Sequence, residues 1–334
     1  MENNCLFVSS RGLLKSCDFH SNNPRSSWGF DNQYLMDMIN GPNMFDGMSI
    51  YVCTDLLESF LCDILPNIKH SFYLVCGDSD ARVPFGCINS WSGNMKPLTE
   101  DVCLKILAHP KLIKWFIQNC IFTNEILLEY LYKNEKIFNS LAETKIFQLP
   151  IGIDYHTISN DPRAYWRDPT CEGYTPKYQE MLLKKINQES KPFYQRNLKI
   201  FVHMSMGESR KDALSKLPQQ CVEHCTETMY RTNVWKKMSE YAFVLSPYGN
   251  GPDCHRHWEI LCLGGIPIIK TFGTDKMFED LPVLIVKEWE DVTEELLQQT
   301  IKIFKDKYIN YNKLSLKYWV DQFSPPTTKL FIHS

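Results

Sequence analysis

Residues 246–265 read SPYGNGPDCHRHWEILCLGG, and this stretch decides the fold of the C-terminal half of the chain. It overlaps the end of the apolar run AFVLSP at 242–247, which predicts a buried strand. Gly249 and Gly251 then allow the backbone to come close to a ligand, because glycine has no Cβ. The pattern therefore predicts a strand that leads into a glycine loop.

A helix is expected to begin directly after this loop. Asp253 has the side chain of a good N-cap, and the apolar spacing predicts a helix over 254–263. The glycines at 264–265 predict its end, and IPIIK at 266–270 predicts the next strand. The N-terminus of such a helix presents unpaired N–H groups and a partial positive charge, which suit a phosphate.

Three side chains of this predicted helix share one face. His255 lies four residues before Glu259, and Arg256 lies three residues before it. Such a face suits a nucleoside diphosphate, with the pyrophosphate on the glycine loop and Arg256 and the ribose hydroxyls on Glu259. A surface ion pair between Arg256 and Glu259 is the alternative, and these residues alone leave both open. The dinucleotide fingerprint GxGxxG is excluded, because Cys254 occupies the place of its third glycine.

The rest of the chain alternates short apolar segments with helical patterns. Strands are predicted within 48–54, 71–80, 113–120, 145–154, 198–207 and 281–286. Helices are predicted between them, one of them at 123–134, and this alternation favours parallel sheets. A stretch rich in Pro, Asp and aromatic residues breaks the rhythm. We therefore predict an N-terminal Rossmann-like domain over 1–155, an interdomain region over 156–197 and a C-terminal Rossmann-like domain over 198–334.

Composition limits the class of protein. The 334 residues suffice for two domains, and a net charge of -3 gives no basic field for nucleic acid or an anionic membrane. The 13 cysteines form no CxxC pair, which indicates reduced thiols. The N-terminus lacks a basic start followed by an apolar stretch, and no run of about 18 apolar residues occurs. We expect a cytoplasmic protein without a membrane span.

The run FVLSPYGNGPDCHRHWEILCLGGIPII resembles the C-terminal signature of the exostosin-like glycosyltransferases, glycosyltransferase family 47 and its relatives. The matching positions are Ser246-Pro247, Gly249-Asn250-Gly251, Asp253-Cys254-His255-Arg256, Trp258-Glu259 and Gly265-Ile266-Pro267. The resemblance extends over roughly 200–286. Segments at 72–84, 113–120 and 146–156 look like the N-terminal half of related viral and microbial members. The eukaryotic relatives carry a membrane anchor that this sequence does not show, so a viral or microbial member, or a shortened chain, is expected.

The resemblance implies a GT-B fold, in which two Rossmann-like domains face each other across a cleft. It implies transfer of a sugar from a nucleotide-diphosphate sugar, expected to be a UDP-sugar, to a hydroxyl of a glycan or other acceptor. Inversion and no metal cofactor are expected. The donor-binding residues that the resemblance implies are Ser205, Ser209, Arg210, Ser246, Gly249, Asn250, Gly251, His255, Arg256 and Glu259. Arg210 fits this role, because a cation in the first turn of a helix opposes the helix dipole unless a ligand compensates.

An inverting enzyme also needs a group that takes the proton of the acceptor hydroxyl. Asp78, Asp80 and Asp154 are candidates, because each follows a predicted strand, and ligands of parallel sheets lie beyond the carboxyl ends of strands. Asp78-Ser79-Asp80 has the DxD spelling of a metal site. Its position in the N-terminal half, away from the donor motif, predicts a turn instead, so no metal is expected there.

Two other functions remain open at this point. A catalytically inactive GT-B protein would bind carbohydrate or nucleotide without turning it over. An unrelated nucleotide-dependent α/β enzyme would show no preference for sugar nucleotides.

Overall fold

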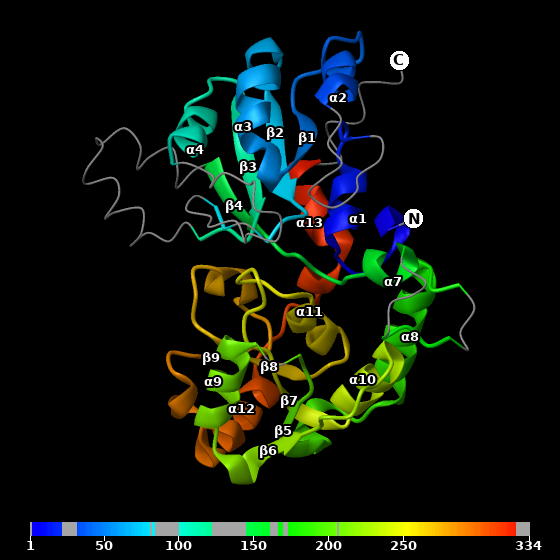
Figure 1. Ribbon diagram of the computed structural model, residues 1–334, viewed down its shortest axis with the longest axis vertical. Coiled ribbons are helices and arrows are strands. Elements are labelled where there is room, and N and C mark those ends of the chain that lie inside the picture. Colours follow the sequence, from blue (N-terminus) through cyan, green and yellow to red (C-terminus); the bar gives the residue numbers. More distant parts are fainter. Residues whose placement is uncertain are drawn as a thin grey trace. The chain divides into compact units, whose positions relative to one another are not determined.

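The computed structural model describes residues 2–21, 32–80, 82–83, 100–121, 145–160, 166–169, 173–205 and 207–324 (Figure 1). The predicted helix at 123–134 lies outside these residues. The chain forms two compact units, named here by the size of their sheets. The four-stranded unit consists of Ser10–Ile151, Asn250–Pro252 and Lys317–Ser334. The five-stranded unit consists of Met1–Ser9, Gly152–Gly249 and Asp253–Leu316.

The sheet of the four-stranded unit is parallel, with the order β1-β2-β3-β4. Its strands are β1 (Met48–Cys53), β2 (Phe72–Gly77), β3 (Leu112–Gln118) and β4 (Ile146–Leu149). Every residue of β1 is buried, which explains its mostly apolar composition, because a parallel sheet is covered on both faces.

Helices supply that cover. The described helices of this unit are α1 (Ser10–Ser16), α2 (Asn32–Ile39), α3 (Leu57–Ser59), α4 (Glu100–Leu107) and nearly all of α13 (Leu316–Phe323). A π-helical turn at Phe60–Ile64 continues α3, and a 3-10 turn at Leu65–Asn67 follows it.

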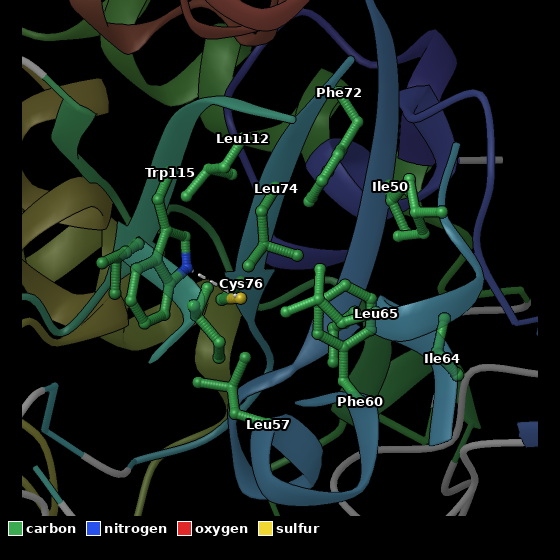
Figure 2. Packing of buried hydrophobic residues seen from close by; sticks show 14 of the residues in the cluster. Ile50, Leu57, Phe60, Ile64, Leu65, Phe72, Leu74, Cys76, Leu112 and Trp115 are labelled. Carbon is green, nitrogen blue, oxygen red and sulfur yellow. Dashed lines mark hydrogen bonds between the residues drawn. The ribbon is translucent and has the colours of Figure 1, made fainter. Parts of the chain in front are cut away.

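One face of this sheet carries the main apolar core of the unit. Figure 2 shows Leu74 of β2 and Trp115 of β3 gathered in this core with Phe60 from the turn after α3. The indole Nε1 of Trp115 donates to Cys76 Sγ at 3.1 Å, so the polar atom of this ring is paired inside the core. On β3, Phe116 points to the other face, because side chains alternate along a strand.

The five-stranded unit has a parallel sheet with the order β6-β5-β7-β8-β9. Its strands are β5 (Asn197–Val202), β6 (Val222–His224), β7 (Tyr241–Leu245), β8 (Ile266–Lys270) and β9 (Leu284–Val286). The chain goes from β5 to β6 on one side and returns to β7 on the other side of β5. The order therefore reverses between β5 and β7, and such a switch point is where open α/β sheets bind ligands.

The described helices of this unit are α7 (His156–Asn160), α8 (Pro176–Glu189), α9 (Glu208–Lys216), α10 (Arg231–Met238), α11 (His255–Cys262) and α12 (Glu294–Asp306). Short 3-10 turns lie at Phe193–Gln195, Gln219–Cys221, Asp275–Phe278, Trp289–Asp291 and Tyr311–Leu314. The alternation of strands and helices and the parallel sheets that the sequence predicted are thus present in both units.

The limits of the units differ from the predicted ones in the middle of the chain. Residues 156–197 form no separate region, since α7 and α8 are part of the five-stranded unit. The amide of Gln179 in α8 donates to the carbonyl oxygens of Tyr155 and Tyr174, and Leu183 of the same helix is buried. These contacts fix α8 against its neighbours within the unit.

The limits differ at both ends of the chain as well. The first nine residues belong to the five-stranded unit, where Val8 N donates to Leu314 O at 2.9 Å and Ile153 N donates to Val8 O at 2.8 Å. Residues 317–323 belong to the four-stranded unit, where the buried ring of Phe323 lies 5.6 Å from that of Phe116. Each end is placed by hydrogen bonds or ring packing with segments that are distant in the sequence.

Candidate functional site

The candidate site lies beyond the carboxyl ends of β5 and β7, at the switch point of the five-stranded sheet. His203 and Ser205 follow β5, and Arg210 stands in the first turn of α9. The segment after β7 runs from Ser246 to Gly249 and continues toward α11. The fold therefore brings together two segments that the sequence separates by about 40 residues.

Two guanidinium groups meet at this site. Arg210 Nη1 donates to the carbonyl oxygen of Ser205 at 3.0 Å and to its hydroxyl at 2.6 Å. Arg256, in the first turn of α11, donates to the carbonyl oxygen of His203. Burial lowers the pKa of Arg256, the carboxylate of Glu259 opposes this shift, and the charge of Arg210 adds to it. Two arginines close enough to disfavour each other's charge are suited to share an anion.

The loop between these arginines is held close to them. Gly249 N donates to Cys254 Sγ at 2.9 Å, and a Cβ on Gly249 would lie 3.2 Å from that sulfur and 3.6 Å from Arg210 Nη2. Burial and the carboxylate of Asp253 raise the pKa of the Cys254 thiol to about 12, so the sulfur stays protonated. Ser246 is fully buried, and its hydroxyl oxygen has no hydrogen-bond partner among the described residues. The absence of a side chain at Gly249 keeps the approach to Arg210 open.

Asn250 and Gly251, predicted on the same loop, belong to the four-stranded unit. Asn250 Nδ2 donates to Asp80 Oδ2 at 3.1 Å. A Cβ on Gly251 would lie 2.9 Å from the amide of Asn119, so glycine is needed there for packing within that unit. The structure thus gives these two loop residues protein partners of their own.

The start of α11 corrects one prediction. The helix begins at His255 with Cys254 as its N-cap, so the prediction that Asp253 is the N-cap was wrong. The carboxylate of Asp253 is buried and accepts from Trp258 Nε1 at 2.9 and 3.1 Å. The carboxylate is therefore paired with the indole five residues later. The predicted end lies within one residue of the observed one, because α11 ends at Cys262, Leu263 is its C-cap and Gly264, with a φ of 72°, comes next.

Glu259 lies in a second charged group, next to the arginine pair. Glu259 is 7% exposed, and its Oε1 lies 3.6 Å from Arg231 Nη2. Arg231 Nη2 also donates to Asp154 Oδ2 at 3.2 Å, and Arg231 Nη1 donates to Gln179 Oε1 at 3.2 Å. Arg231 was not among the site residues predicted from the sequence. The signal that singled out Arg210, a cation in the first turn of a helix, is also present here.

Asp154 is the carboxylate of this group with the most hydrogen-bond and ion-pair partners. His156 Nδ1 lies 3.2 Å from its Oδ1, and the backbone N of Thr157 donates to the same oxygen at 2.9 Å. Burial alone would raise the pKa of Asp154. The charges of Arg231, His156 and His255 and the bond from Thr157 outweigh burial and hold this pKa far below its usual range. A carboxylate held this firmly in its charged form is a poor proton acceptor, so its geometry suits the positioning of Arg231.

His255 and the two serines after β5 complete the predicted donor set. His255 Nδ1 lies 2.7 Å from Gly152 O, and its ring lies 6.2 Å from that of His156. Ser205 and Ser209 are exposed, and Ser205 is bound to Arg210 as described above. Of the ten predicted donor residues, eight therefore belong to the five-stranded unit.

The other two candidate bases lie in the four-stranded unit. Asp78 has a φ of 57°, its side chain is 6% exposed, and its Oδ2 lies 3.2 Å from Arg11 Nη2. Asp80 is exposed and accepts from Asn250. Of the three predicted carboxylates, Asp80 is therefore the accessible one.

A scan against protein-family models finds no match for this sequence, and a search of curated proteins finds none either. Within the described ranges, no three His, Cys, Asp or Glu side chains gather closely enough to hold a metal ion. No helix in the described part of the chain is both long and apolar enough to cross a membrane. The site is therefore characterised by its arginines and by its place in the sheet.

Proposed function

We propose that this protein is a glycosyltransferase that binds a nucleotide-diphosphate sugar at the switch point of the five-stranded sheet. The observation that carries the proposal is the convergence of Arg210 and Arg256 beside a glycine loop at this point. This is the site type that binds phosphates in open α/β sheets. The exostosin-like resemblance of residues 246–267 supports the same function and implies the GT-B arrangement of the two units.

The diphosphate of the donor would be held by the two guanidinium groups. Arginine matches phosphate oxygens with paired N–H donors, and these charges would stabilise the diphosphate as it leaves. This stabilisation requires no metal ion, so we propose metal-independent transfer. UDP is the nucleotide that the resemblance favours.

The ribose would be held by Glu259. Its contact with Arg231, at 3.6 Å, has the length of an ion pair and not of a good hydrogen bond. The carboxylate therefore keeps capacity to accept hydrogen bonds from the two ribose hydroxyls. The buried hydroxyl of Ser246, which follows β7 and has no hydrogen-bond partner within the described ranges, is a further candidate donor.

On the GT-B arrangement that the resemblance implies, Asp80 is the base that we propose for the transfer. It would take the proton of the acceptor hydroxyl while the oxygen bonds to the anomeric carbon and the bond from that carbon to the diphosphate breaks. Its exposure distinguishes it from Asp78 and Asp154, which are both held in buried ion pairs. Attack from the face opposite the leaving diphosphate gives inversion.

Calorimetric titration with UDP, UMP and GDP tests donor binding. We expect UDP to bind more tightly than UMP, because only UDP carries the second phosphate for the arginine pair. Arg210→Ala should remove most of this difference, whereas Lys211→Ala, one residue further on the same helix, should leave it unchanged. Failure of every nucleoside diphosphate to bind would refute the proposal.

A binding protein without turnover is the second candidate. The ion pairs of Asp78 and Asp154 favour it, because they leave one accessible carboxylate among those predicted. Slow hydrolysis of UDP-sugars by the wild-type protein, lost in Asp80→Asn with UDP affinity retained, would support the enzyme. Tight UDP binding with no hydrolysis and no transfer to any acceptor would support the binding protein.

A further inference from the structure

The five-stranded unit contains a hollow at the carboxyl end of α11, apart from the candidate site described above. Its volume of about 680 Å³ is in the range of small-molecule sites. The arginine pair lies by the amino end of the same helix, and eight helical residues span about 12 Å. The lining residues come from the first residues of the chain, the end of α8 and the segment after it, the end of α11, and the turn at Tyr311–Leu314. This hollow is therefore separate from the proposed donor site.

The charge of this hollow is positive. Its lining includes Lys191 and Arg196 and contains neither Asp nor Glu. Arg196 is 8% exposed and forms no ion pair with a carboxylate among the described residues. Burial lowers the pKa of Arg196 to about 10, which shows how poorly the charge is compensated. A buried charge without a counter-ion is costly, and an anion in the hollow would reduce that cost.

The hydrogen bonds of Arg196 leave part of its guanidinium unused. Nε donates to Lys191 O at 2.6 Å, and Nη2 donates to Leu263 O at 2.8 Å. The second bond caps the end of α11, which accounts for one structural role of this arginine. Nη1 is buried and has no hydrogen-bond partner in the described part of the chain. The capping of α11 therefore accounts for the hydrogen bond of Nη2. It accounts neither for the burial of Nη1 nor for a guanidinium charge without a carboxylate partner among the described residues.

The walls of the hollow are apolar. Phe7 and Phe193 are largely buried in them, whereas Leu6, Tyr194 and Tyr311 are exposed by 47%, 40% and 47%. Large apolar side chains that remain exposed around one hollow mark a binding surface. An aromatic or alkyl group would cover them.

We propose that this hollow binds a small amphipathic anion. Its anionic head, a carboxylate or a phosphate ester, would lie against Arg196 and Lys191. Its aromatic or alkyl body would lie against Phe193, Tyr194 and Tyr311. The site goes beyond the proposed transferase activity and does not depend on it.

Calorimetric titration with 4-phenylbutyrate, in the presence of saturating UDP, tests this site. We expect binding of the anion and at least about tenfold weaker binding of the neutral isostere 4-phenylbutanol. Lys191→Gln should weaken binding about fivefold, since Lys191 is exposed, and the exposed Lys199→Gln on β5 should leave it unchanged. Arg196→Gln, which keeps a donor for Leu263, should weaken it about tenfold or more.

Three results would overturn the proposal. They are equal affinity for the acid and the alcohol, displacement of 4-phenylbutyrate by UDP, and unchanged affinity in Lys191→Gln. The Lys191 variant keeps the test decisive if Arg196→Gln does not fold. Binding of 4-phenylbutyrate by a protein that fails to bind UDP would support this site and refute the donor site, so the two proposals fail separately.

Discussion

Arg231 holds two carboxylates of the five-stranded unit at once. Its guanidinium bonds to Asp154 and forms an ion pair with Glu259, and all three side chains are nearly buried. A buried arginine between two acids fixes both in space, because neither acid can leave without exposing an unpaired charge. The orientation of Glu259 therefore depends on Arg231 and, through it, on Asp154.

The pH dependence of stability tests this arrangement. The pKa of Asp154 is held far below its usual value of about 3.9, so its stabilisation is complete above that value and is lost as the pH falls toward the folded-state pKa. Asp154→Asn should cost about 3 kcal/mol of unfolding free energy at pH 7. The difference from wild type should shrink below about pH 4. Urea unfolding of both proteins from pH 3 to 7 measures it, and a difference independent of pH would contradict the ion pair.

In the proposed donor site, Glu259 would hold the ribose of the nucleotide. Glu259→Ala should weaken UDP affinity by about 1.5–3 kcal/mol, the contribution of hydrogen bonds to a charged group. Glu240→Ala is the matched control, because Glu240 is exposed and pairs only with the neighbouring Lys237 at 2.8 Å among the contacts found. Calorimetry with UDP gives both values. An unchanged affinity in a folded Glu259→Ala protein would remove this residue from the site.

Among the elements, α11 connects most of the features described here. Its first turn carries Arg256 beside the glycine loop, and its end is capped by Arg196 at the hollow described above. Its middle is fixed by Trp258, which Asp253 holds by two hydrogen bonds. A helix fixed at three places positions its N-terminal side chains firmly, which a phosphate site requires.

The end of α11 can be tested through its glycine. Gly264 has a φ of 72°, and a Cβ there would lie 3.0 Å from Asn187 Oδ1 and 3.2 Å from Arg196 Nη2. Gly173 has a φ of 69° with no atom of a described residue within 4 Å of its Cβ position, so its substitution tests backbone strain without that crowding. Gly173→Ala should cost about 1 kcal/mol, and Gly264→Ala should cost about 1–2 kcal/mol more. Thermal unfolding measures both, and equal costs would show that the crowding at Gly264 is relieved without strain.

At the scale of the whole molecule, both ends of the chain cross from one unit to the other. Each terminal segment belongs to a different unit from the residues that adjoin it in the sequence. The first nine residues pair with the segments around Gly152 and Ser315 in the five-stranded unit. Residues 317–323 pack on the four-stranded sheet through Phe323. Neither unit is therefore a single continuous stretch of chain, and separate expression of residues 1–155 or 198–334 would remove part of a unit.

Phe323 provides a test of this division. Phe323→Ala removes a fully buried ring from the four-stranded unit and should cost about 3–5 kcal/mol. Amide exchange should rise in β3 more than in β5, because local stability follows the packing of each unit. Tyr308→Ala, at a residue 74% exposed, should change stability by less than about 0.5 kcal/mol. Loss of protection in β5 but not in β3 would contradict the assignment.

Much of the fold could be predicted from local patterns. The buried strands of both sheets contain apolar runs such as IYVC and AFVL, which burial on both faces favours. The glycines after α11 predicted its end, because few other residues adopt a positive φ. The start of α11 was misplaced by one residue, because a local pattern does not show that the indole of Trp258 binds Asp253.

The sequence by itself determined the α/β alternation, the glycine loop before α11 and the positions of Arg210 and Arg256 in the first turns of two helices. Each of these features depends on neighbours a few residues away. Only the tertiary structure decided the strand order, the switch point between β5 and β7 and the partner of Glu259. Strand order depends on contacts between segments far apart in the chain. Arg231 reaches Glu259 from another helix, and helical spacing predicts contacts only within one helix. The unpaired charge of Arg196 was also hidden, because burial is a property of the packed unit.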